Sequence, residues 1–269
     1  MVWLLPRFYN IIWKRLNSLT RKLNINVGDL LESNNYGVFE ILSITGQQNI
    51  TIKFLNTGTI VYEQRARSLI SGNIKDYYAP HVCKVGYLGV GQYKTNTHPT
   101  IANLWYQMME RCYTDKHSKH GGFWYSDVTV CDEWHNFQNF AAWCEKQHKE
   151  DGWHLDKDLR KPGNKLYSPD SCCMIPQELN HLLNKNKGQR GEYPIGVTTR
   201  TDGRTFRAVV SNPEGKAFSF YGFKTVESAF EKYKTVKSAV IKQQAEKWKD
   251  KLPPDVYFNL VNYEIKIDD

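Results

Sequence analysis

The stretch HLDKDLRKPGNKLYSPDSCCMIPQELNHLL, residues 154–183, decides how the centre of this chain folds. It opens with a short strand-like run at 154–156, which a Pro-Gly turn at 161–164 separates from a second apolar run at 172–175. A helix is expected from about Pro176 to Leu183, because proline is well tolerated in a first helical turn. The sequence therefore predicts the order strand, loop, strand, helix.

The segment from residue 81 to this stretch predicts two helices with apolar faces. Apolar residues recur at helical spacing from Ile101 to Cys112, and Asp132 is expected to cap a second helix. The apolar face of that second helix is formed by Trp134, Phe137, Phe140 and Cys144. We interpret both faces as core rather than as ligand sites.

The N-terminal part predicts a helix followed by a small β module. Residues 1–24 carry five Lys or Arg residues and no acidic residue among aromatic and aliphatic side chains, which predicts a basic amphipathic helix. It could dock on the rest of the protein, serve as a presequence or a membrane-surface helix, or contact nucleic acid or protein partners. Its charges interrupt any run that could span a bilayer. Residues 25–80 contain short apolar runs between turn residues and predict a small β barrel of the Src-homology type.

The C-terminal part predicts a sheet packed on a helix. A polar, glycine-containing linker at 184–192 precedes three short strand-like runs at 195–197, 206–210 and 218–220. Apolar residues from Val226 to Val240 then trace one face of a long helix.

Four motifs between residues 105 and 183 resemble those of phage-type HNH homing endonucleases. They are Trp105-x-x-Met108-x-x-Arg111-Cys112-Tyr113, Val130-Cys131-Asp132-Glu133-Trp134-x-x-Phe137-x-x-Phe140, Leu155-Asp156-Lys157-Asp158 and Tyr167-Ser168-Pro169-x-x-Cys172. In that family a two-stranded turn packed on a helix holds one divalent metal ion, and a nearby histidine deprotonates the attacking water. The metal offsets the charge of the phosphate and orients the scissile bond.

Carried over position by position, the resemblance implies that Asp156 and Asn180 bind Mg²⁺ or Mn²⁺, both of which prefer oxygen ligands. Lys157 stands where the family usually has its base histidine. Only about one lysine in two thousand is neutral at pH 7, so lysine is a poor base. We therefore expect His154 or His181 to activate water, and Lys157 to stabilise the phosphate. The alternative for residues 156–158 is a solvated turn with a local ion pair.

A candidate structural zinc site consists of Cys112, His117, His120 and Cys131. The spacing C-x4-H-x2-H-x10-C is looser than the spacing of finger-type sites, which use tighter cysteine pairs. We do not expect zinc here. The six cysteines show no C-x-x-C pair and are expected to be free thiols in a reducing compartment.

The C-terminal part looks like the plant ethylene-response-factor type of DNA-binding domain. The resemblance lies in Gly196-Val197, Arg204-x-Phe206-x-Ala208, Tyr221-Gly222-Phe223-x-Thr225 and Glu227-x-Ala229. Strand alternation places Phe206, Ala208, Val210, Phe218 and Phe220 toward the helix. The residues expected to face outward and contact DNA are Thr198, Arg200, Thr205, Arg207, Ser219 and Tyr221.

The charge balance agrees with an anionic partner. Thirty-six Lys and Arg residues against 28 Asp and Glu residues give a formal net charge of +8. We expect double-stranded DNA as the main partner, with phage or host proteins as further partners of the N-terminal helix. The expected location is the cytoplasm of a phage-infected bacterial cell, or the phage particle itself.

The sequence as a whole predicts a multidomain α+β protein. Its expected parts are 1–24, the helix; 25–80, the barrel; 81–183, an HNH-like nuclease module with a ββα-metal-like fold; 184–192, the linker; and 193–269, the DNA-binding domain. Two functions stay open at this point. One is a metal-dependent DNA nicking endonuclease, and the other is an inactive relative that acts as a DNA-binding regulator or as a structural or interaction protein of a phage particle.

Overall fold

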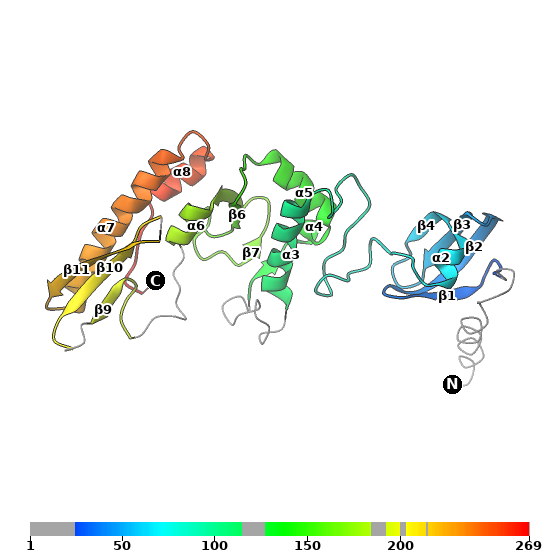
Figure 1. Cartoon of the computed structure of the whole chain (residues 1–269), viewed down its shortest axis with the longest axis horizontal. Helices are drawn as coiled ribbons and strands as arrows, with labels where there is room; N and C mark the ends of the chain where they lie inside the picture. The colour runs from blue at the N-terminus through cyan, green and yellow to red at the C-terminus, as the bar shows by residue number, and fades with distance from the viewer. Residues whose placement is uncertain (1–24, 115–126, 184–191, 200–202, 214, 269) are drawn as a thin grey trace. The chain divides into compact units, whose positions relative to one another are not determined.

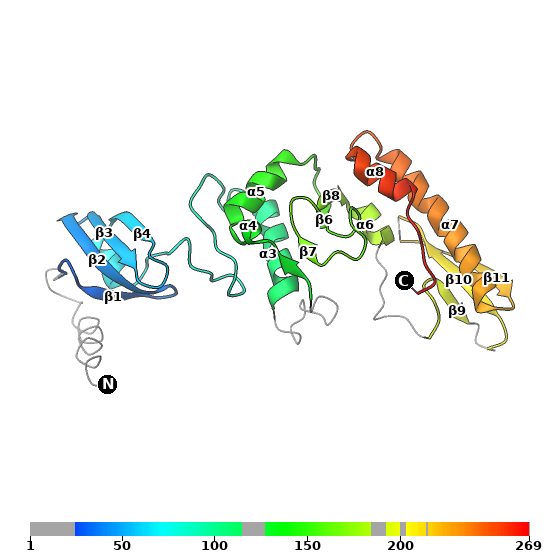
Figure 2. The same ribbon diagram turned by 180° about the vertical axis from the view of Figure 1, so that it is seen from behind.

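The structure is a computed structural model that describes residues 25–114, 127–183, 192–199, 203–213 and 215–268 (Figures 1 and 2). Within these residues it is a mixed α+β protein with seven helices and four small sheets. The chain divides into two compact units, residues 1–126 with 132–141, and residues 127–131 with 142–269. The predicted N-terminal helix at 1–24 lies outside the described residues, as does the linker at 184–191.

The first unit begins with an antiparallel sheet of four strands in chain order: β1 (Leu30–Ser33), β2 (Gly37–Gly46), β3 (Asn49–Phe54) and β4 (Ile60–Gln64). Helix α2 (Ala66–Ile70) contributes Ala66 and Leu69 to the same core as the inward residues of the strands. The expected barrel is not closed within the described residues, because β1 pairs with β2 and β4 pairs with β3. Helix α2 thus packs its apolar residues on this sheet, which has no further strand pairing among the described residues.

The same unit contains α3 (Pro99–Tyr113), α4 (Asp132–His135) and the first part of α5 (Phe137–Lys146). The Trp105 indole is buried and its Nε1 donates to the carbonyl oxygen of Trp134 at 2.7 Å. One helix was expected from Asp132 onward, but the helix is interrupted at Asn136. The backbone of Tyr87 causes this break, since its N–H donates to the His135 carbonyl and its own carbonyl accepts from Phe137 N.

The second unit contains two pairs of short strands and a helix before its C-terminal part. Strands β6 (Trp153–Asp156) and β8 (Cys173–Pro176) pair antiparallel, and α6 (Gln177–Leu183) follows. Strands β5 (Thr129–Val130) and β7 (Leu166–Tyr167) form an additional parallel pair. The predicted order of strand, loop, strand and helix between 154 and 183 is therefore confirmed, with β7 added inside the loop.

The C-terminal part of this unit is a three-stranded sheet with two helices. The sheet order is β11 (Ala217–Phe223), β10 (Phe206–Ser211), β9 (Val197–Thr199), and the helices are α7 (Val226–Lys247) and α8 (Pro254–Val261). Thr225 caps α7, because its hydroxyl oxygen accepts from Ser228 N at 3.2 Å. Gly196 has φ +73° and lies against the Tyr233 ring, where no larger side chain fits. Three strands and a long helix were predicted here; α8 was not.

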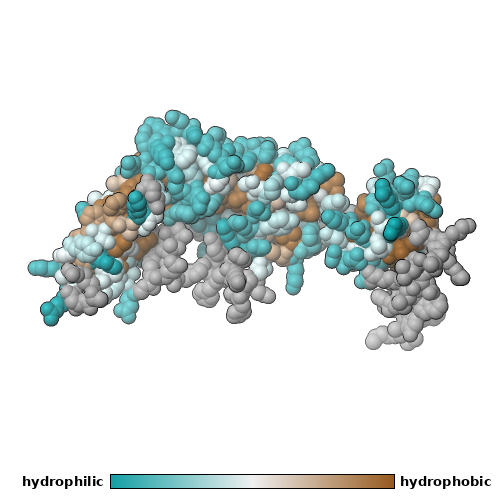
Figure 3. All heavy atoms as spheres, in the orientation of Figure 1, coloured by the Kyte–Doolittle hydropathy of each residue, from teal (hydrophilic) through white to brown (hydrophobic). Residues whose placement is uncertain are grey.

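Among the described helices, none is long and apolar enough to cross a membrane. Hydrophilic residues dominate the visible surface, and apolar patches also show over the C-terminal sheet (Figure 3).

Candidate functional site

Strand β6 presents two predicted site residues on one face. Trp153 and Leu155 are buried, whereas His154 and Asp156 alternate with them and are half-buried. Alternate residues of a strand share a face and lie roughly 7 Å apart, so the His154 and Asp156 side chains point to the same side of the hairpin. Across the hairpin, His154 is opposite Ile175 and Asp156 is opposite Cys173.

Helix α6 brings two further predicted residues to His154. The amide nitrogen Nδ2 of Asn180 donates to Nδ1 of His154 at 3.0 Å. The His181 ring meets the His154 ring edge-on, with 6.0 Å between the ring centroids. The helix follows β8 directly and packs on both β6 and β8, which is why residues 26 and 27 positions apart meet. We call His154, Asn180 and His181 the histidine–amide cluster.

The orientation of the Asn180 amide affects what each member of this cluster can do. With Nδ2 donating to Nδ1, the neutral His154 ring carries its proton on Nε2, and its basic nitrogen is already occupied. The Oδ1 atom of Asn180 is the atom that could coordinate a metal ion. His181 is exposed on α6. This arrangement therefore favours His181 over His154 as the group that takes a proton from water.

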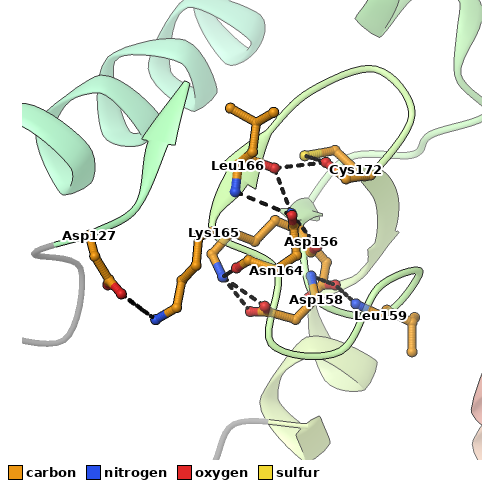
Figure 4. Close-up of polar contacts among 10 residues, drawn as sticks. Asp127, Asp156, Asp158, Leu159, Asn164, Lys165, Leu166 and Cys172 are labelled. Carbon is orange, nitrogen blue, oxygen red and sulfur yellow. Dashed lines mark hydrogen bonds and ion pairs between the residues drawn. The ribbon is translucent and has the colours of Figure 1, made fainter. Parts of the chain in front are cut away.

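Asp156 organises the loop that follows β6. Its Oδ1 accepts from the backbone N–H groups of Asp158 at 3.0 Å and Leu159 at 2.7 Å (Figure 4). Burial raises the pKa of the Asp156 carboxyl above its ordinary value, and the charge of Asp158 acts in the same direction, while the two N–H donors oppose it. None of the hydrogen bonds or ion pairs among the described residues joins Asp156 to Asn180. The two expected metal ligands are thus placed on neighbouring elements without direct contact.

The Lys157 side chain points into the loop that follows β6. Its side chain is buried, and Nζ donates to both carboxylate oxygens of Asp158, at 2.7 and 2.8 Å, and to the carbonyl oxygen of Asn164 at 2.7 Å. All three ammonium hydrogens are then used. This geometry contains the local ion pair that was the alternative interpretation of residues 156–158. It leaves Lys157 without an N–H donor for a phosphate.

Asn164 is a structural residue of this loop that the sequence analysis treated only as part of a turn. Its Nδ2 donates to the carbonyl oxygens of Lys157 and Leu166, and its Oδ1 accepts from Leu166 N (Figure 4). The turn composition at 161–164 was a signal for such a residue, because asparagine side chains often bond to nearby backbone in turns. Lys165 adds an exposed ion pair with Asp127 at 3.0 Å.

The C-terminal helices hold α6 and the loop after β6. Glu178 Oε1 accepts from Lys247 Nζ and from Trp248 Nε1, both at 2.7 Å, and the Trp248 ring contacts the Trp153 ring edge-on. From α8, Asp255 pairs with Arg160 at 2.7 Å and Asn259 donates to the Leu159 carbonyl. Glu178 lies two residues before Asn180, so these contacts fix the helix that carries two of the three residues of the histidine–amide cluster. Sequence patterns at the separated positions gave no sign of them.

The outward face of the C-terminal sheet contains three of the predicted DNA-contacting residues. Arg207 is opposite Thr198 and Val209 is opposite Ser219, and antiparallel partners share a face, so Thr198, Arg207 and Ser219 lie together. The Nε atom of Arg207 is buried and has no hydrogen-bond partner among the described residues. Tyr221 is 58% exposed where the β10–β11 register shifts. Thr205 precedes β10 and its carbonyl accepts from Thr199, and Arg200 lies outside the described residues.

The inward face is as predicted at Ala208 and Val210, which are fully buried, and at Phe220, whose ring lies 4.7 Å from Lys232 Nζ of α7. Phe218 is opposite Val210 and therefore on the helix side, yet it is 52% exposed. Its position next to the turn at 212–216 leaves it beyond the covered part of the sheet. The prediction that Phe218 faces the helix side of the sheet is confirmed, and its side chain is exposed for this reason.

The described part of the chain contains no group of three or more His, Cys, Asp or Glu side chains that could hold a metal ion. Two of the four residues weighed for zinc, His117 and His120, lie outside the described residues. The site expected at Asp156 and Asn180 has one carboxylate and one amide, and is therefore not a group of three such side chains.

Comparisons with protein-family models, curated proteins and solved structures find no match to this chain.

Proposed function

We propose that this protein binds double-stranded DNA and nicks it in a reaction that depends on Mg²⁺ or Mn²⁺, as the resemblance to phage HNH homing endonucleases implies. The observation that carries the proposal is the 3.0 Å contact between Asn180 and His154, which joins the helix to the hairpin with His181 beside them. A two-stranded hairpin packed on a helix, with an amide and two imidazoles meeting on it, is the arrangement that such a hydrolytic site needs. The setting we propose is the cytoplasm of a phage-infected bacterial cell.

Each residue has a distinct proposed role. Asp156 and Oδ1 of Asn180 would hold the metal ion, which neutralises charge on the phosphate and orients the scissile bond. His181 takes the proton from the attacking water, and His154 holds the Asn180 amide in place. Burial raises the pKa of the Asp156 carboxyl above its ordinary value, and a bound cation would act in the opposite direction.

A plasmid-nicking assay with added Mg²⁺ or Mn²⁺ tests this proposal. We expect conversion of supercoiled to nicked plasmid by the wild type. Loss of the base in His181→Ala is expected to lower the rate by about 10² to 10⁴-fold. Asp156→Ala and Asn180→Ala should also abolish nicking, while Gln177→Ala, which changes an exposed residue of the same helix, should nick normally. Nicking that survives Asp156→Ala would exclude this site.

A second function is favoured by the position of Lys157. Its ammonium is fully used inside the loop at the place where the family usually has a base histidine. A DNA-binding regulator, or a phage structural or interaction protein without nuclease activity, would have this arrangement. Duplex binding without metal-dependent nicking by the wild type would support this second function over the first.

A further inference from the structure

A cavity of about 560 Å³ lies in the first unit, away from the histidine–amide cluster. Residues from three parts of the unit line it: Lys75 and Tyr77, the loop at 88–96 and the first turn of α5. Its volume falls within the range of small-molecule sites, roughly 300–1,000 Å³. The cavity is therefore large enough for one nucleotide.

The loop that forms one wall is fixed by the side chain of Gln138. Its Nε2 donates to the carbonyl oxygens of Leu88 at 3.1 Å and Tyr93 at 2.9 Å, and its Oε1 accepts from Tyr93 N at 3.1 Å. A Cβ atom at Gly91 would lie 2.2 Å from Oε1 of Gln138, so glycine is needed for this approach. The wall is preorganised, which lowers the entropy cost of binding.

The charged groups of the cavity are all positive. Lys75 and Lys94 line it, and none of the lining residues is acidic. Neither ammonium has an ion-pair or hydrogen-bond partner among the described residues. The nearby Asp76 carboxylate is buried and already accepts from the Thr57 hydroxyl and from Tyr78 N. Two unpaired lysines in a lining that contains no acidic residue attract a phosphate group.

The remaining lining suits a planar ring with polar edges. Tyr77, which is 39% exposed, and Tyr93 offer aromatic rings, and Leu88, Val90 and Phe137 add apolar surface. Thr95 and Asn96 supply hydrogen-bonding groups. Bases stack on such aromatic side chains in proteins that bind single-stranded nucleic acid.

We propose that this cavity binds a nucleoside monophosphate. Lys75 and Lys94 hold its phosphate, and its base packs against Tyr77. The ligand is either a free nucleotide or one unpaired nucleotide of a DNA strand, and both sources present the same chemistry. The proposal does not depend on nuclease activity, since every residue involved lies outside residues 154–181.

Calorimetric titration of the full chain with thymidine monophosphate tests the proposal. We expect saturable binding, at least tenfold weaker binding of thymidine or of inorganic phosphate alone, and at least tenfold weaker nucleotide binding by the double variant K75Q/K94Q. The matched control K53Q/K224Q removes the same charge at two exposed lysines outside the cavity and should bind normally. Tyr77→Phe should retain binding and Tyr77→Ala should weaken it. Thermal unfolding verifies that each variant is folded.

Two results would overturn the proposal: no saturable binding of thymidine monophosphate up to millimolar concentration, or equal binding by the double variant and the wild type. A parallel titration with an eight-residue oligothymidylate identifies the source of the ligand. Binding at least tenfold tighter than the mononucleotide supports an unpaired DNA nucleotide, and equal binding supports a free nucleotide. Plasmid nicking and duplex binding are measured separately, so failure of the proposed function leaves this result interpretable.

Discussion

At the scale of single residues, Lys157 illustrates what a sequence can and cannot reveal. Its position beside Asp156 suggested contact with a phosphate, but the direction of a long flexible side chain is set by partners that come together only on folding. Asn164, seven residues away, supplies one of those partners. Asp158, the other, is adjacent in sequence, which is why the local ion pair could be named as an alternative.

Replacement of Lys157 by methionine should destabilise the fold, because the carbonyl of Asn164 loses a buried donor. We expect a loss of about 2 kcal/mol in the free energy of unfolding, measured by urea denaturation. Lys161→Met changes an exposed lysine of the same loop and serves as the control, with an expected change within about 0.5 kcal/mol. Equal stability of the two variants would show that Lys157 does not hold the loop.

Asp156 makes the stability of the protein depend on pH in a defined direction. Burial raises the pKa of this carboxyl in the folded state, so the folded protein binds its proton more tightly than the unfolded chain does. The stability from this group is present below the ordinary aspartate pKa of about 3.9 and is lost as the pH rises through the raised folded value. Asp156→Asn keeps the Oδ1 acceptor without the charge. Its stability relative to the wild type should rise between pH 4 and pH 7 in urea denaturation, and a constant difference would contradict this account.

At the scale of elements, short runs bounded by turn residues were predictable and distant pairings were not. The hairpin and helix at 154–183 and the three strands before α7 follow from apolar runs, Gly-Pro turns and helical spacing. The break at Asn136 depends on the backbone of Tyr87, about fifty positions away, and β5 pairs with β7 across 37 positions. In the candidate site, the resemblance implied Asn180, and the search for a base in place of Lys157 led to His154 and His181; these three residues do meet. The contacts of Glu178 with Lys247 and Trp248 were not predicted.

Trp248, the C-cap of α7, donates a hydrogen bond to Glu178 of α6. This contact predicts that the end of α7 stabilises the hairpin and α6. Burial acts to raise the pKa of Glu178, but the hydrogen bonds from Lys247 and Trp248 outweigh it and leave the pKa below its ordinary value. Trp248→Phe removes the Nε1 donor while keeping a ring against Trp153, and should cost about 1 kcal/mol of unfolding free energy. Trp248→Ala, which also loses the ring contact, should cost about 3 kcal/mol. Chemical denaturation measures both, and equal costs would assign the effect to the lost hydrogen bond alone and contradict a contribution from the ring contact.

At the scale of the whole molecule, one basic protein contains both the hairpin of the proposed hydrolytic site and a sheet with an outward polar face. The net charge of +8 favours DNA without specifying it, and the predicted contact residues Thr198, Arg207 and Ser219 share the face away from α7. The prediction of a barrel at 25–80 was wrong, because closure requires the first and last strands to pair and strand-like runs do not show whether they do. The predicted N-terminal helix and Arg200 lie outside the described residues and stay predictions.

Binding to duplex DNA measured across a range of salt concentrations tests the central claim most directly. Each phosphate contact contributes about −0.9 to the slope of log K against log salt. The account predicts a steep negative slope for the wild type, a slope reduced by about one for Arg207→Gln, and an unchanged slope for Lys53→Gln, an exposed lysine of the other unit. A flat slope, or no binding of duplex DNA at low salt, would contradict the account.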